Sequence, residues 1–151
     1  MRPAGHLILS GLLFLGFYYF SRSFVLSFSL ALAQVAVDID HLVDYIIFAP
    51  RPLSIKKFFT KGNPLTWRRI VFFLHGWEWV LILFLICIKI NNSFLWVVSL
   101  GYFIHLCLDT TVNRFTYKML KLDKYFYFLI FRFKNGFIID KICPPRIRQV
   151  Q

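Results

Sequence analysis

The four histidines of the chain, together with nearby carboxylates, are the side chains whose types and spacing could do chemistry. His6 stands at the start of an apolar segment, and the other three histidines have an acidic residue three or four positions away. At these spacings both members of a pair lie on one face of a helix. The pairs are Asp38 with His41, His75 with Glu78, and His105 with Asp109.

Imidazole and carboxylate groups that face inward from several helices form metal centres in helical bundles. They suit zinc, with manganese or iron as alternatives, because no cysteine is placed to contribute. Two ions would neutralise this set better than one, and two-metal centres hydrolyse phosphoesters, here with Glu78 or Asp40 as the candidate catalytic base. The predicted metal ligands are His6, Asp38, Asp40, His41, His75, His105 and Asp109.

Four apolar segments carry these residues, and each is about as long as the roughly 20 residues that span a bilayer. Because only three residues separate the first from the second and the third from the fourth, we expect two antiparallel hairpins. A composition that is 58% hydrophobic over 151 residues is too apolar for a soluble domain of this size. The predicted fold is an all-α integral membrane protein with about four transmembrane helices, at Pro3 to Phe20, Phe24 to Asp44, Ile70 to Ile90 and Phe94 to Asn113.

The net charge of +11 comes from basic residues that lie between and after the apolar segments. Arg2, six residues of the central connection and nine residues from Arg114 to Arg148 fall on one side of this topology, against Arg22 and Lys89 on the other. The positive-inside rule then predicts a multi-pass protein of the inner membrane with both termini in the cytoplasm, and no nucleic-acid partner. All the candidate ligands would gather at the cytoplasmic leaflet.

The chain divides into a metal-site domain over residues 1–113 and a basic, aromatic segment over residues 114–151. From Phe115 to Phe133, apolar residues recur at steps of three and four between lysines and arginines, which predicts an amphipathic helix on the bilayer surface. Lys134-Asn135-Gly136-Phe137 is instead a hairpin-turn signal, so the end of this helix stays ambiguous. Pro144-Pro145 begins a tail that we expect to be loose.

Residues 1–113 resemble the family of membrane-bound, metal-dependent hydrolases that are also described as LexA-binding, inner-membrane-associated hydrolases. The matching residues are His6 with Gly11, the Asp38-Ile39-Asp40-His41 motif, a histidine in the third segment, and Gly101-Tyr102-Phe103-Ile104-His105 with Asp109. That family is distantly similar to zinc-dependent phospholipase C. The resemblance implies a helical fold, zinc ligation by histidine and aspartate, and hydrolysis of a phosphoester or phospholipid.

Three other functions compete with hydrolysis. A non-enzymatic metal-binding or transport protein would need polar groups that continue across the membrane. A bis-histidine haem protein would need two histidines facing an apolar slot, whereas carboxylates accompany these histidines. A lipid-headgroup transferase would need a Gly-Ala-Arg spacing near its aspartates, which the sequence lacks.

Overall fold

The computed structural model describes residues 3–49, 51–54, 56, 58, 67–116 and 125–143. These residues form helices joined by turns, and the described part contains no strand, only one isolated antiparallel bridge between Arg69 and Ile138. The all-α prediction is therefore confirmed for the described residues. The Pro144-Pro145 tail, residues 117–124 and most of the basic connection between Ile55 and Thr66 lie outside them.

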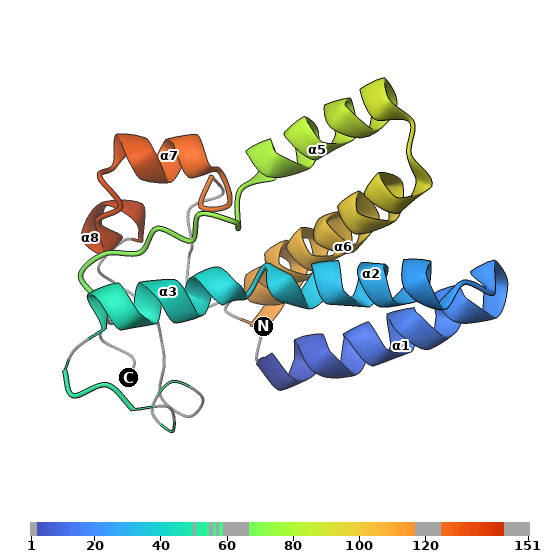
Figure 1. The fold of residues 1–151 in the computed structure, drawn as a ribbon. Coiled ribbons are helices and arrows are strands. Elements are labelled where there is room, and N and C mark those ends of the chain that lie inside the picture. The colour runs from blue at the N-terminus through green and yellow to red at the C-terminus, as the bar shows by residue number, and fades with distance from the viewer. Residues whose placement is uncertain are drawn as a thin grey trace.

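The first two helices form the expected hairpin. Helix α1 (Pro3–Ser21) and helix α2 (Phe24–Ala36) lie side by side, and the Ser23 side chain caps α2 by accepting a hydrogen bond from Leu26 N. After a turn at Val37 and Asp38, helix α3 (Ile39–Phe48) continues the line of α2 (Figure 1). The break at residues 37–38 falls inside the second predicted segment, at the Asp-Ile-Asp-His motif.

Helix α5 (Trp77–Ile90) and helix α6 (Ser93–Thr116) form the second hairpin, joined at Asn91, which adopts the left-handed conformation that ends many helices. The third predicted segment is wrong at its start, because α5 begins at Trp77 and not at Ile70. Residues 70–76 form an irregular turn. His75 therefore stands before the helix, and His75 and Glu78 do not share a helix face.

Helix α6 crosses α2 closely at Gly101. A Cβ atom at this position would overlap the carbonyl oxygen of Leu30 and would lie 3.2 Å from the Ala33 side chain. Only glycine allows this approach, as is common where helices pack in membranes. The contact matters for the site because His105 lies one turn further along α6 and faces the end of α2.

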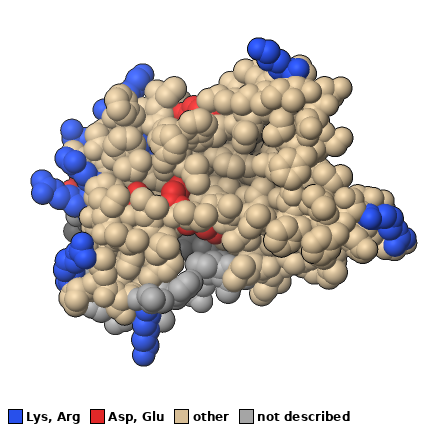
Figure 2. Space-filling model, in the orientation of Figure 1, with Lys and Arg blue, Asp and Glu red and all other residues tan. Residues whose placement is uncertain are grey.

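Most of the surface of the two hairpins is apolar. Among the described residues, two helices are long and apolar enough to cross a membrane, Phe24–Phe48 and Ser93–Val112, and about a third or less of each is buried inside the protein, so the four predicted spans stay a prediction. Figure 2 shows this surface in tan, with basic side chains beside α3, α7 and α8 and at the far tips of the hairpins. Exposed apolar side chains include Leu12, Phe20 and Phe24 on the first hairpin and Leu85 and Phe94 on the second.

The C-terminal segment folds back onto the turn before α5. Helix α7 (Leu129–Lys134) and helix α8 (Ile139–Ile142) are short, and Gly136, with φ of +63°, lies in the turn between them. The predicted amphipathic helix from Phe115 to Phe133 is therefore wrong for residues 125–128, which are not helical, and its residues 117–124 lie outside the described part. Ile139, Ile142 and Ile70 are buried in one hydrophobic core with Leu106 of α6 and Tyr45 of α3.

Candidate metal centre

The structure brings the predicted metal ligands together from five parts of the chain. His6 comes from α1, Asp38 from the turn between α2 and α3, Asp40 and His41 from α3, His75 from the turn before α5, and His105 and Asp109 from α6. Six of these seven residues form two groups, each of three residues and each compact enough to hold one ion.

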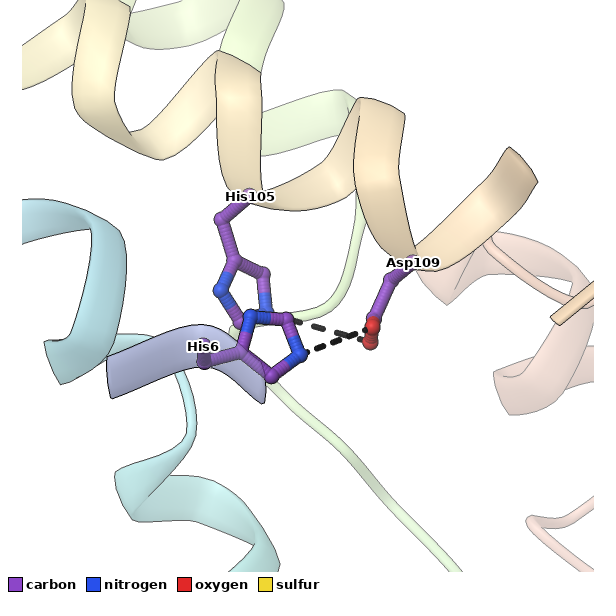
Figure 3. A group of neighbouring side chains, drawn as sticks. All are labelled: His6, His105 and Asp109. Atoms are coloured by element: carbon purple, nitrogen blue, oxygen red, sulfur yellow. Dashed lines mark hydrogen bonds and ion pairs between the residues drawn. The ribbon is translucent and has the colours of Figure 1, made fainter. Parts of the chain in front are cut away.

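The first group is fully buried and joins α1 to α6 (Figure 3). His6 Nε2 lies 3.1 Å from Asp109 Oδ1, and His105 Nε2 lies 3.8 Å from Asp109 Oδ2. The two imidazole rings stack with their centres 4.5 Å apart. His105 and Asp109, four residues apart, point from successive turns of α6 toward His6, as their spacing predicts.

The second group lies beside the first and is more open. Asp38 Oδ1 lies 3.5 Å from His41 Nε2 and 3.7 Å from His75 Nε2. The side chains of His41 and Asp38 are 28% and 21% exposed, whereas His75 is buried. A molecule that enters the centre from outside would therefore meet the second group before the first.

His75 connects the two groups. Its Nε2 atom lies 3.4 Å from Asp109 Oδ2 and 3.1 Å from Nε2 of His105. Asp38 Oδ1 is also 3.7 Å from Nε2 of both His75 and His105. The carboxylates of Asp109 and Asp38 thus each lie near residues of both groups. This arrangement is expected of ligands that bridge two ions.

The hydrogen bonds at the far side of the rings fix where the protons lie. His105 Nδ1 is 2.6 Å from the carbonyl oxygen of Gln34, and His75 Nδ1 is 3.0 Å from the Asp40 carboxylate, so each Nδ1 carries the proton and donates it. Both Nε2 lone pairs then point at each other across 3.1 Å. Two lone pairs at this distance repel unless a proton or a metal ion lies between or beside them.

Without a metal, a proton on Nε2 of His75 removes the repulsion between the two Nε2 atoms. Burial disfavours its imidazolium form, but the hydrogen bonds to Asp109, Asp38 and Asp40 outweigh burial and raise the pKa of His75 well above its ordinary value. The centre is therefore built to hold positive charge among buried carboxylates. Such groups are retained when they are paired or coordinate a metal.

The observed separations also fit metal ligation. Ligand atoms around a tetrahedral ion with bonds of roughly 2.0 to 2.2 Å lie roughly 3.3 to 3.6 Å apart. The distance from Asp38 to His41 is 3.5 Å and that from Asp109 to His75 is 3.4 Å, within this range, and that from His6 to Asp109 is 3.1 Å, slightly below it. The two groups could therefore hold a metal ion.

The break between α2 and α3 serves the centre directly. Asp38 N donates to Val35 O, three residues back, so the carbonyl of Gln34 is left to accept the proton of His105 Nδ1. The Gln34 side chain also contacts Nδ1 of His6, at 3.2 Å, and accepts a hydrogen bond from Ser10. Gln34 therefore orients two of the four histidines.

Two carboxylates of α3 hold the turn that carries His75. Asp40 Oδ2 accepts a hydrogen bond from Leu74 N and lies beside His75 Nδ1. Asp40 therefore orients the His75 ring and is not a member of either group. Asp44, four residues on, accepts from Val71 N and Phe72 N. Asp40 thus takes the N–H group of Leu74, which a helix from Ile70 would have used internally, and Asp44 takes the N–H groups of Val71 and Phe72.

The structure places Glu78, the other candidate base, outside the two groups. Its two carboxylate oxygens accept hydrogen bonds from Leu129 N, at 2.9 Å, and Ile130 N, at 3.0 Å. Glu78 therefore satisfies the first N–H groups of α7 and ties α5 to the C-terminal segment. These contacts assign it an anchoring position.

Three residues that surround the centre have no role assigned by the sequence patterns. Gln34 is an uncharged polar residue in an apolar segment, Tyr102 lies inside the Gly101-to-His105 motif, and Arg132 is one of several basic residues of the C-terminal segment. Tyr102 donates to the carbonyl of Leu74, and Arg132 is fully buried against the same turn. A buried polar residue in an apolar segment is the signal that would have found Gln34.

No family model, curated protein or solved structure matches the chain. The resemblance of its motifs to membrane-bound metal-dependent hydrolases therefore stays a prediction, and the case for function rests on the geometry of the centre.

Proposed function

We propose that this protein is a membrane-embedded, metal-dependent hydrolase that acts on a phosphoester or a lipid-type substrate at the cytoplasmic leaflet. One observation carries the proposal: Nε2 of His75 and Nε2 of His105 face each other at 3.1 Å, and each ring donates its Nδ1 proton in the opposite direction. Buried carboxylates surround them. A positive charge between the two Nε2 atoms is therefore stabilised, and a divalent ion carries more positive charge than a proton does.

Each ion would have its own ligands. His6, His105 and Asp109 would hold one ion, and Asp38, His41 and His75 would hold the other, with Asp109 and Asp38 shared. Imidazole and carboxylate favour zinc. Two zinc ions held there would supply a water nucleophile at neutral pH and neutralise the charge that develops on a phosphoryl oxygen.

The chain's own residues orient this chemistry. Asp40 and the Gln34 carbonyl fix the Nδ1 proton on His75 and His105, which keeps both Nε2 atoms available. His41 and Asp38 form the open side, so a substrate would enter there. Asp38 is the carboxylate at that open side and would be a ligand there, whereas Glu78 is held at the backbone of α7.

The proposed membrane topology is multi-pass, with both termini on the cytoplasmic side of the inner membrane. The apolar hairpin surfaces support it, since the basic side chains lie beside the metal centre and the hairpin tips carry only Arg22 and Lys89. Helix α5, with 14 residues, is about 21 Å long, shorter than the hydrocarbon core of about 30 Å. A stretch that is too short is accommodated by local thinning of the bilayer.

The test is metal-dependent hydrolysis by detergent-purified protein. The wild type, loaded with zinc, is compared with His105→Ala and His41→Ala on a chromogenic phosphodiester and on phospholipid vesicles. The proposal predicts turnover that a chelator abolishes and zinc restores, and a loss of at least about 100-fold in kcat/KM in either variant. Asp140→Asn, at an exposed position of α8, is the control and keeps full activity.

Turnover that survives in both histidine variants would overturn the proposal. Bound zinc without turnover on any phosphoester would favour the alternative, a non-enzymatic metal-binding or transport protein. Vesicle-reconstituted protein and a zinc-sensitive dye inside the vesicles would then separate binding from transport.

A further inference from the structure

The turn that carries His75 has no regular structure of its own, and other parts of the chain hold it on two sides. We call residues 71–75 the His75 turn. Its N–H groups meet the carboxylates of α3: Val71 N and Phe72 N donate to Asp44 at 2.6 and 2.9 Å, and Leu74 N donates to Asp40 at 2.8 Å. The negative charges therefore lie on the N–H side of the turn.

The opposite side of the His75 turn presents carbonyl groups, and Arg132 meets them. Nη2 of Arg132 donates to Phe72 O at 3.0 Å and to His75 O at 3.1 Å. Tyr102 donates to the carbonyl between them, that of Leu74. The turn thus lies between anionic acceptors on its N–H side and a cationic donor on its carbonyl side.

Arg132 is an unusual residue to find in this place. Its side chain is 0% exposed, and within the described part of the chain its Nε and Nη1 atoms have no hydrogen-bond partner. Burial lowers its pKa to about 10, against the attraction of Asp40 and Glu78, so it stays charged at neutral pH. A buried, incompletely paired guanidinium is costly, so the contacts it makes must matter.

The His75 turn also needs to be held. Phe72 has a φ of 44°, in the left-handed region that a bulky side chain rarely adopts. Such a residue keeps its conformation only where its surroundings enforce it. The surroundings here are Asp44 at the Phe72 N–H and Arg132 at the Phe72 carbonyl.

We propose that Arg132 is a positioning residue of the metal centre: by holding the carbonyls of Phe72 and His75, it keeps the His75 ring where both metal groups need it. The inference rests on the proposed metal centre, since His75 belongs to one group and contacts two residues of the other. It also gives the C-terminal segment a role in the centre that its basic sequence does not reveal. Loss of Arg132 should therefore loosen the turn and weaken both ions together.

The experiment compares Arg132→Met, Arg132→Lys and Lys134→Met with the wild type in detergent. Met keeps much of the length of the side chain without its donors, Lys keeps the charge and can donate to both carbonyls, and Lys134→Met removes one exposed charge from the same helix. Two quantities are measured: amide hydrogen exchange of residues 71–76 in the zinc-free protein, and zinc affinity by equilibrium dialysis.

The expected result is faster exchange in the His75 turn and zinc affinity at least about tenfold weaker for Arg132→Met, partial recovery for Arg132→Lys, and no change for Lys134→Met. Unchanged exchange at residues 71–76 in Arg132→Met, or unchanged zinc affinity, would overturn the inference. If the wild type itself binds no zinc, the proposed function fails, while the exchange measurement still decides whether Arg132 holds the turn. Should Arg132→Met not fold, Arg132→Lys carries both measurements with smaller expected changes.

Discussion

The helical hairpins and the His75 turn are held together in different ways. In α1, α2 and α6 most backbone hydrogen bonds stay within the helix, and much of the side-chain surface is apolar and exposed. In the His75 turn, backbone groups depend on side chains from distant parts of the sequence, such as Asp44 and Arg132. The hairpins supply a scaffold that local sequence determines, and the turn supplies a ligand that only the complete fold can place.

Asp44→Ala should produce the largest effect on the turn. It leaves Val71 N and Phe72 N without an acceptor, at a cost of about 3 kcal/mol in the free energy of unfolding. Asp44→Asn keeps an oxygen acceptor at the same place and should lose much less. Denaturant titrations of both variants in detergent measure the difference, and equal stability would show that the turn does not depend on this contact.

Gly101→Ala tests the scaffold half of the comparison. The new methyl group would overlap the Leu30 carbonyl, so α6 must shift, and we expect a loss of about 2 kcal/mol. Gly16→Ala on α1 is the matched control, because its methyl group meets nothing within 4 Å. The melting temperatures of the two variants give the answer, and a Gly101→Ala protein as stable as Gly16→Ala would contradict the close crossing.

Low pH should weaken metal binding, because His75 in the turn is then protonated. The raised pKa of His75 keeps it protonated in the metal-free protein, so zinc must displace this proton. Zinc affinity should therefore rise with pH, by about tenfold per pH unit, for as long as the pH stays below the raised pKa of His75. The metal-free protein keeps the stabilising proton at low pH and loses this stabilisation as pH rises through the raised pKa. Dialysis at several pH values measures the slope, and a flat profile would remove His75 from the ligand set.

Glu78→Gln should have the smallest effect, and it separates two interpretations of one residue. From its position near His75 in the sequence, Glu78 was a candidate base, but its contacts are with the backbone of α7. We expect a stability loss of about 1 kcal/mol and kcat within about twofold of the wild type. A large fall in kcat at unchanged zinc content would restore the catalytic interpretation.

Sequence patterns predicted the helices because apolar length and short polar connections are local properties. The ligand set stays a prediction, although the structure brings six of its seven residues together in two groups, and it came from the cost of histidine and aspartate in apolar segments. The sequence patterns failed at residues 70–76, where the apolar run Ile70-Val71-Phe72-Phe73-Leu74 favours a helix and where Asp40 and Asp44 capture the N–H groups instead. They also failed at Arg132, because nothing in a basic segment marks which arginine folds inward.

The most direct test of the metal centre is the zinc content of the purified protein by elemental analysis. Wild type, His41→Ala and His75→Ala are expressed with zinc supplied and purified in detergent without chelator. The account predicts about two zinc ions per chain in the wild type, about one in His41→Ala, and a loss of both in His75→Ala, whose ring contacts both groups. A folded wild type with no bound divalent metal, or a His75→Ala protein with an undiminished zinc content, would contradict it.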